Sequence, residues 1–336
     1  MARSDWRILV EARKHPAAQL LLDLIAESIA DAGHHVVRWR GPSSGRVSCG
    51  RVLWDCDVAF LFNGTTLRYQ PVLEHLRRNG ASVVFLELGW HPQSSTMQLD
   101  LDGINADASW VAKPLPRAGV TPLSVRPDGD LLVLLQDECD TQITRHSAHF
   151  QRMDDFIAFL ADHSALPLRV RAHPKFPPGK PVEELVRRRG LAWDDCQSLG
   201  ESLRDCRAVA CVNSSGAVEA LQSRLPVICF GRAVYRHSGA VYCLERSGAE
   251  LAAATQELLD GRSSLFAERV DDVVERIIGQ QWTPAEIPGR IPALLDVLLA
   301  QRAAPATSGR LSWRDFFQAA PTLWTTYLEP KMRGIS

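Results

Sequence analysis

The chain has 336 residues, of which 46% are hydrophobic and 23% are charged, an ordinary composition for a globular protein. This length accommodates two cores of typical domain size. With 38 basic and 39 acidic side chains the formal net charge is −1, so we expect no nucleic-acid partner, and any anionic ligand must be held by local groups.

The cysteines and the hydropathy pattern indicate a cytoplasmic protein. The eight cysteines form no C-x-x-C pair and no other metal-binding spacing, which favours free thiols. Residues 1–10 lack the apolar core and the cleavage site of a secretion signal. No apolar stretch reaches the length of a membrane span.

The first part of the chain alternates short apolar runs with segments of helical periodicity, which predicts a parallel sheet with helices on both faces. The expected strands are 6–10, 35–39, 52–62 and 81–86, and the expected helices are 17–32 and 70–79. The alternation lapses in a proline-rich stretch between residues 89 and 130.

A second alternating series begins at residue 130. Its expected strands are 130–135, 167–171, 208–212 and 226–230, and its expected helices are 148–162, 182–189, 217–223 and 248–259. The predicted fold class is therefore α/β with two Rossmann-like, doubly wound domains facing a central cleft. The predicted domains are residues 1–128, residues 129–300 and an aromatic tail, 301–336, expected to pack back on the first domain. A contact of this tail with a membrane surface is the alternative.

The segment Asn213-Ser214-Ser215-Gly216 follows an apolar strand and opens a helix. Unpaired N–H groups, two hydroxyls and a glycine suit a phosphate. The alternative is a simple serine cap with a glycine needed for packing. Glu219, in the same helix, is a candidate partner for a ribose.

Three further segments follow strands of the predicted sheets. His173-Pro174-Lys175 offers an imidazole and an ammonium group for a phosphate, with a structural role as the alternative. In Gln136-Asp-Glu-Cys-Asp140-Thr-Gln142 a carboxylate can attack an anomeric carbon, although acids are also typical of a helix start. Glu87 is a candidate general acid or base, or a loop acid without a catalytic role.

The pair Asp100-Leu-Asp102 has the D-x-D form of the metal site of single-Rossmann glycosyltransferases. We interpret it as a β-hairpin turn and expect neither a metal nor a cofactor.

Together these segments resemble the capsule polysaccharide biosynthesis family (KpsC/KpsS-like), which contains retaining β-Kdo glycosyltransferases of GT-B fold, and more loosely bacterial sialyltransferases. The resemblance covers residues 85–235 and rests on the order of the motifs more than on any one of them. The motifs are Gln136-x-x-x-Asp140-x-Gln142, His173-Pro174, Asn213-Ser-Ser-Gly-x-x-Glu219 and Pro226-Val-Ile-x-x-Gly231-x-x-x-Tyr235.

The resemblance implies a CMP-linked sugar donor, with Kdo foremost, and a glycan or glycolipid acceptor. It implies that His173, Ser214 and Ser215 hold the phosphate and that Glu219 lies near the nucleoside. Asp140 would be the nucleophile of a retaining reaction, and Glu87 would act as acid/base for the acceptor. Lys175 or a nearby arginine is a partner for the carboxylate of Kdo.

Two departures from the family pattern stand out. Glu87 is followed by Leu-Gly-Trp rather than by the D-G-F of the best-characterised members, and the chain has a single transferase module. The alternative functions are a teichoic-acid-like CDP-glycerol glycerophosphotransferase and a non-catalytic scaffold of a polysaccharide assembly complex.

Overall fold

The computed structural model describes residues 5–13, 15–41 and 56–301. These residues form two compact units, the first up to Ile104 and again from Gln281, the second from Asn105 to Gln280. The division differs from the boundary predicted near residue 128, because the chain leaves the first unit earlier and returns to it after residue 280. The predicted tail lies outside the described residues beyond Gln301.

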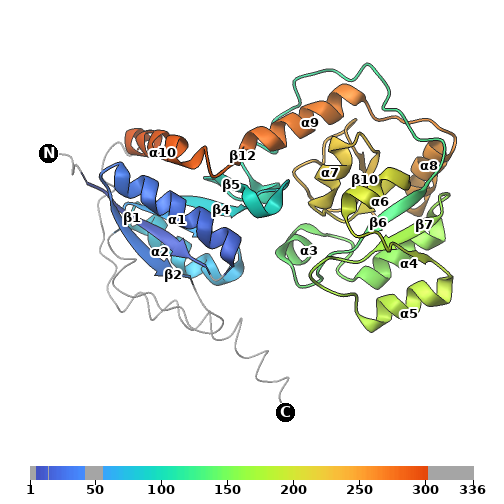
Figure 1. Cartoon of the computed structure of the whole chain (residues 1–336), viewed down its shortest axis with the longest axis horizontal. Coiled ribbons are helices and arrows are strands. Elements are labelled where there is room, and N and C mark those ends of the chain that lie inside the picture. Colours follow the sequence, from blue (N-terminus) through green and yellow to red (C-terminus); the bar gives the residue numbers. More distant parts are fainter. Residues whose placement is uncertain (1–4, 14, 42–55, 302–336) are drawn as a thin grey trace, which may run out of the picture. The chain divides into compact units, whose positions relative to one another are not determined.

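The first unit is built on a six-stranded sheet in the order β12-β5-β4-β3-β1-β2 (Figure 1). The strands β1 to β4 run parallel, while β5 is antiparallel to β4 and β12 is antiparallel to β5. The strands are β1 (Arg7–Ala12), β2 (His35–Arg40), β3 (Val58–Phe62), β4 (Ser82–Leu88), β5 (Met97–Asp100) and β12 (Gln281–Trp282).

Helices cover both faces of this sheet because successive side chains of its strands point to opposite faces. In β1, Ile8 and Val10 pack with α1 (Pro16–Asp31) and α10 (Ile287–Gln301). The intervening Leu9 packs on the other face with α2 (Gln70–Arg78). Short 3-10 turns lie at Leu67–Tyr69 and Gln93–Ser95.

The second unit is built on a six-stranded sheet, all parallel, in the order β11-β10-β9-β6-β7-β8. The strands are β6 (Asp130–Leu134), β7 (Leu168–Arg171), β8 (Ala192–Trp193), β9 (Cys206–Cys211), β10 (Val227–Cys229) and β11 (Tyr242–Cys243). The core strand β9 is fully buried.

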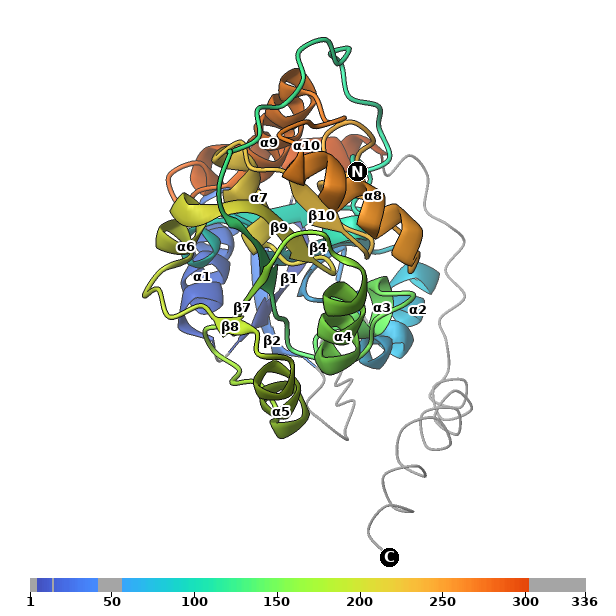
Figure 2. The ribbon, with the colours of Figure 1, turned by 90° about the vertical axis from the view of Figure 1, so that its right-hand side faces the viewer.

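The helices of the second unit also lie on both sides of its sheet, with α4 and α5 on one side and α6 and α7 on the other (Figure 2). The helices are α3 (Thr141–His146), α4 (Met153–His163), α5 (Lys180–Arg189), α6 (Leu199–Asp205), α7 (Gly216–Gln222), α8 (Gly248–Leu259) and α9 (Ala267–Gln280), with a 3-10 turn at Asn105–Asp107. Within the described residues, no helix combines the length and the apolar character needed to cross a membrane.

Each sheet contains one point where the strand order reverses direction, which is where doubly wound folds bind their ligands. In the first unit β1 lies between β2 and β3, and in the second unit β6 lies between β7 and β9. These two places are called here the first and the second switch point. The predicted fold class of two Rossmann-like, doubly wound domains is confirmed.

Candidate functional site

A pair of amide side chains closes the second switch point. Gln136 follows β6 and Asn213 follows β9. The Gln136 Nε2 donates to Asn213 Oδ1 at 2.8 Å, and the Asn213 backbone N–H donates to Gln136 Oε1 at 3.0 Å. Asn213 is buried, so these reciprocal bonds satisfy polar groups that water cannot reach. The predicted residues Gln136 and Asn213 therefore hold the chain segments after β6 and β9 together.

Asn213 also positions helix α3. Its Nδ2 donates to the backbone oxygen of Gln142 at 2.8 Å, which ties the first turn of α3 to the end of β9. The predicted residue Gln142 thus contributes its main chain to this contact.

Asp140 is the N-cap of α3. Its Oδ1 accepts from the Gln142 N–H at 2.7 Å and from the Thr141 hydroxyl at 3.3 Å. The side chain is exposed, and both bonds involve the same oxygen. The helix-start interpretation of this segment is thus correct, and it leaves Oδ2 available for a ligand.

His173 follows β7, the strand next to β6, and its imidazole is held in one tautomer. Nδ1 accepts a hydrogen bond from the Lys175 backbone N–H at 3.2 Å. Because Nδ1 is the acceptor, the proton of the neutral ring is on Nε2. His173 therefore presents a neutral N–H donor.

The surroundings of His173 keep it neutral near pH 7. Burial lowers its pKa below the ordinary value of 6.5, Lys175 lowers it further, and the carboxylates of Asp137 and Asp140 act in the opposite direction. The influence of Asp140 indicates that the predicted nucleophile and the predicted phosphate ligand lie within electrostatic range of each other. The His173 ring also contacts the Phe176 ring, with centroids 5.0 Å apart.

The serine turn lies on the opposite side of β6, after β9. Ser214 Oγ accepts from the Gly216 N–H at 3.2 Å, whereas the Ser215 side chain makes no capping bond to the helix. A Cβ at Gly216 would come within 2.9 Å of Leu199 and 3.1 Å of Leu134. The glycine is therefore needed for packing, as in the alternative interpretation, and the two hydroxyls remain half-buried at the edge.

Tyr235 holds the backbone of this turn in place. Its hydroxyl donates to the Ser214 backbone oxygen at 2.8 Å, and its ring is fully buried. Tyr235 is part of a sequence motif that gives it no role, because the contact depends on two segments 21 residues apart meeting in space.

The remaining predicted residues of the second unit surround this edge. Pro174 and Lys175 are exposed. Glu219 points toward α6, since a Cβ at Gly200 would lie 3.3 Å from its Oε1. Arg171, the arginine nearest to His173 in the sequence, is paired with the fully buried carboxylate of Asp194. Of the two cations considered for the sugar carboxylate, Lys175 is therefore the more accessible.

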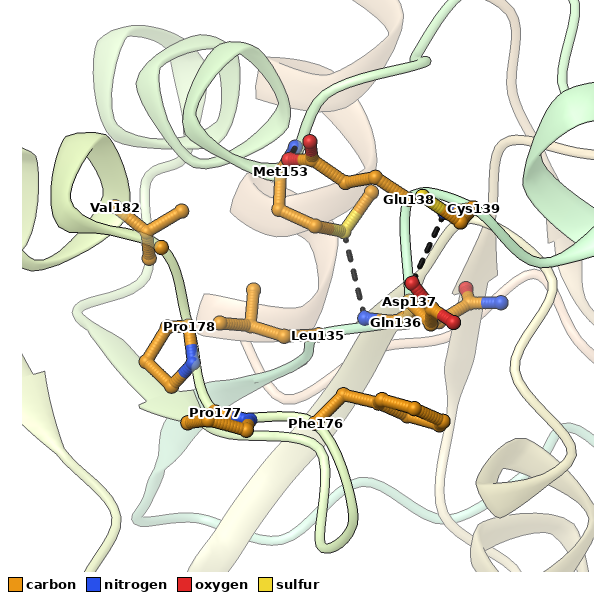
Figure 3. A pocket seen from close by; sticks show the side chains of 11 residues that line it. Leu135, Gln136, Asp137, Glu138, Cys139, Met153, Phe176, Pro177, Pro178 and Val182 are labelled. Atoms are coloured by element: carbon orange, nitrogen blue, oxygen red, sulfur yellow. Dashed lines mark hydrogen bonds between the residues drawn. The ribbon is translucent and has the colours of Figure 1, made fainter.

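A pocket of about 210 Å³ opens beside this edge, between the loop after β6 and the loop after β7 (Figure 3). Leu135, Met153 and Val182 form apolar wall, and Gln136 is the one predicted residue among those that line it. The Gln136 N–H points at the Met153 sulfur, at 3.4 Å. Phe176 links this pocket to His173, because it lines the pocket and its ring also contacts the His173 ring.

Glu87 belongs to the first unit. It lies inside β4, not after it as predicted, because the strand continues to Leu88. Its Oε1 accepts from the Leu88 N–H at 2.9 Å. The pair Asp100-Leu-Asp102 forms a turn, in which Asp100 Oδ1 accepts from the backbone N–H groups of Asp102 and Gly103 at 2.8 and 3.2 Å.

The loop after Glu87 is held by Gln281, a residue that belongs to none of the sequence motifs. Gln281 Oε1 accepts from the Trp90 and His91 N–H groups at 2.5 and 2.8 Å. A Cβ at Gly89 would lie 2.0 Å from Thr96 Oγ1 and 2.8 Å from Gln281 Oε1. The missing side chain of Gly89 thus leaves space for the side chains of Thr96 and Gln281.

Residues 120–247 match the model of a family described as capsule polysaccharide biosynthesis protein. The matched residues contain β6 to β11 and lie within the second unit. The match contains every predicted site residue except Glu87, and it confirms the family resemblance over these residues.

Solved structures of low sequence identity align with most of the chain. The beta Kdo 2,7 transferase of Thermosulfurimonas dismutans KpsC is 16% identical, with 81% of this chain and 99% of that chain covered and a TM-score of 0.48. The beta Kdo 2,4 transferase of the same protein is 12% identical, with 85% and 98% covered and a TM-score of 0.44. Spinosyn forosaminyltransferase SpnP is 13% identical, with 88% and 100% covered and a TM-score of 0.41. No curated protein matches the sequence.

Proposed function

We propose that this protein is a glycosyltransferase of bacterial surface polysaccharide synthesis that transfers Kdo from CMP-Kdo to a glycan or glycolipid acceptor. The observation that carries the proposal is the convergence of three chemistries on neighbouring strand ends of the matched segment. A carboxylate follows β6, an imidazole donor follows β7 and a pair of hydroxyls follows β9.

The phosphate of the donor is proposed to lie at the second switch point. The Nε2–H of His173 and the hydroxyls of Ser214 and Ser215 are neutral donors, which suffice for the single phosphate of CMP, and Lys175 adds one positive charge. This arrangement explains why a CMP sugar would be favoured over a nucleoside diphosphate sugar, whose leaving group carries more charge to neutralise. Glu219 would contact the nucleoside.

Asp140 is proposed as the nucleophile. One oxygen is held by the start of α3, so the other attacks the anomeric carbon while the bond to the CMP phosphate breaks and its electron pair leaves with CMP. The acceptor hydroxyl then attacks the same carbon, loses its proton to Glu87 and releases Asp140. Two inversions give net retention.

The test uses intact-protein mass spectrometry after incubation with CMP-Kdo, CMP-sialic acid and CDP-glycerol. We expect hydrolysis of CMP-Kdo and a glycosyl adduct in the wild type, and a loss of turnover of at least about a thousandfold in Asp140→Asn. Asparagine caps helices about as well as aspartate, so this variant keeps its fold. Asp154→Asn removes another acid from the first turn of a helix of the same unit and serves as the matched control.

Two outcomes contradict the proposal. Turnover of CDP-glycerol that is unaffected by Asp140→Asn identifies a glycerophosphotransferase. Absence of hydrolysis and of adduct with all three donors identifies a non-catalytic scaffold.

A further inference from the structure

A buried carboxylate closes the first switch point. Glu11 lies at the end of β1 and is fully buried. Its Oε2 accepts from the Phe62 N–H of β3 at 2.9 Å, and its Oε1 accepts from the Tyr69 hydroxyl at 2.5 Å and from Arg13 Nη1 at 3.0 Å. Glu11 therefore bridges the two strands between which the sheet order reverses. A buried carboxylate is unfavourable unless such partners compensate it.

The chain is packed tightly around this carboxylate. Tyr69 is fully buried, and its ring meets Trp39 edge-on with centroids 6.5 Å apart. A Cβ at Gly41 would lie 2.1 Å from Glu11 Oε1, so only glycine allows the backbone to pass here. Glu11 is too deeply buried to contact a ligand. It can influence ligand binding by holding Arg13, which is partly exposed.

Two groups hold the guanidinium of Arg13, and a third holds its backbone. Nη1 bonds to Glu11, the guanidinium lies over the Phe62 ring at 5.2 Å from its centroid, and the backbone N–H donates to Gln19 at 2.8 Å. The side chain is 26% exposed.

The remaining edge of the guanidinium is available for a ligand. Among the residues that the structure describes, Nε and Nη2 of Arg13 have no hydrogen-bond partner. This is the edge that forms two parallel bonds with a carboxylate or a phosphate. Because the protein has already fixed the orientation of the side chain, a ligand loses little affinity to ordering it.

We infer that the first switch point is an anion subsite, in which the Nε–Nη2 edge of Arg13 binds a carboxylate or phosphate group of an acidic sugar or glycolipid, and in which Glu11 and Tyr69 act as positioning residues. That this acidic sugar or glycolipid is the acceptor rests on the proposed transferase function. The anion subsite itself does not depend on that function. Arginine rather than lysine is required, because a lysine provides charge but not the planar fork.

The test is an NMR titration of the full chain with glucuronic acid, glycerol 1-phosphate and uncharged glucose, each without a nucleotide. We expect both anions or one of them to bind, and their difference identifies the carboxylate or the phosphate as the preferred group. Arg13→Lys retains a cation beside Glu11 and so protects the fold, yet it should weaken anion binding by about tenfold or more, and Arg13→Gln at least as much. Arg78→Gln, which changes an exposed arginine of α2 paired with Glu74, should leave binding unchanged.

Three results would overturn the inference: equal binding by Arg13→Lys and the wild type, an equal loss in Arg78→Gln, or binding of glucose as tight as that of the anions. CMP titrated into the same variants separates the two proposals. If CMP fails to bind even the wild type, the donor assignment of the second unit fails, while the anion titration still decides on Arg13.

Discussion

The two switch points of this molecule are closed by different chemistry. At the second, Gln136 and Asn213 exchange two hydrogen bonds between neutral amides. At the first, the buried carboxylate of Glu11 takes the same bridging place and requires Arg13 as its counter-ion. Both bridges join the two neighbouring strands at which the order reverses, β1 with β3 and β6 with β9. The fold therefore explains why a bridge is present, but it does not determine whether the bridge is charged or neutral.

The difference bears on what each edge offers to a ligand. A neutral bridge adds no charge, so the second unit leaves a histidine N–H and two hydroxyls to meet an anion. A charged bridge brings an arginine with it and fixes that arginine at the surface. The first edge is therefore organised around an arginine that the bridge holds, and the second around neutral donors with the exposed Lys175 beside them.

Removing the charged bridge should have the largest effect. Glu11→Ala leaves the Phe62 N–H, the Tyr69 hydroxyl and the Arg13 guanidinium without their acceptor, which should lower the free energy of unfolding by about 3 to 5 kcal/mol. Urea denaturation measures this value. Glu74→Ala, at an exposed position of α2, is the control and should change it by less than about 1 kcal/mol. A loss below 1 kcal/mol in Glu11→Ala would show that the bridge does not hold the strands.

Removing the neutral bridge should have a smaller effect on stability. Asn213→Ala leaves the Gln136 amide and the Gln142 carbonyl each short of a partner, at a cost of about 2 kcal/mol in the free energy of unfolding. Gln222→Ala, at an exposed position of α7, is the matched amide control. If the two variants unfold at the same urea concentration, the hydrogen bonds of the Asn213 side chain do not stabilise the second unit.

The smallest expected effect is a titration at the second edge. The pKa of His173 is lowered, so its NMR midpoint should lie below 6.5, and Asp137→Asn, which removes a charge that raises this pKa, should move the midpoint further down. The unfolded state takes up the proton first. The contribution of His173 to stability is therefore complete above pH 6.5 and is lost as the pH falls through the lowered pKa. A titration midpoint of His173 at or above 6.5, or an upward shift of that midpoint in Asp137→Asn, would contradict the lowered pKa and the stated influence of Asp137.

Much of the fold follows from local sequence patterns, and the division into units does not. The helix expected at 248–259 has the bounds of α8, and the strands flanking the motifs lie within a few residues of their expected places. The return of the chain to the first unit depends on contacts such as Gln281 with Trp90, which are 191 residues apart. Helix α3 is not among the expected helices and enters only as the alternative interpretation of the acids before it, because its six residues are too few to show a helical period.

The candidate site shows the same limit. That Asp140, His173 and the serines follow strands is visible in the sequence, because apolar runs end immediately before them. That Gln136 bonds to Asn213 depends on β6 and β9 being neighbours, which the order of elements along the chain does not reveal. Glu11 gave no signal at all, since one acid at the end of an apolar strand is indistinguishable from a solvated one.

The most direct test of the central claim is a crystal structure of the protein with CMP. We predict that the phosphate lies within hydrogen-bonding distance of His173 Nε2 and of a hydroxyl of Ser214 or Ser215, with Asp140 facing the same space. A well-ordered CMP bound elsewhere, with no contact to any of these residues, would contradict the assignment of the donor site.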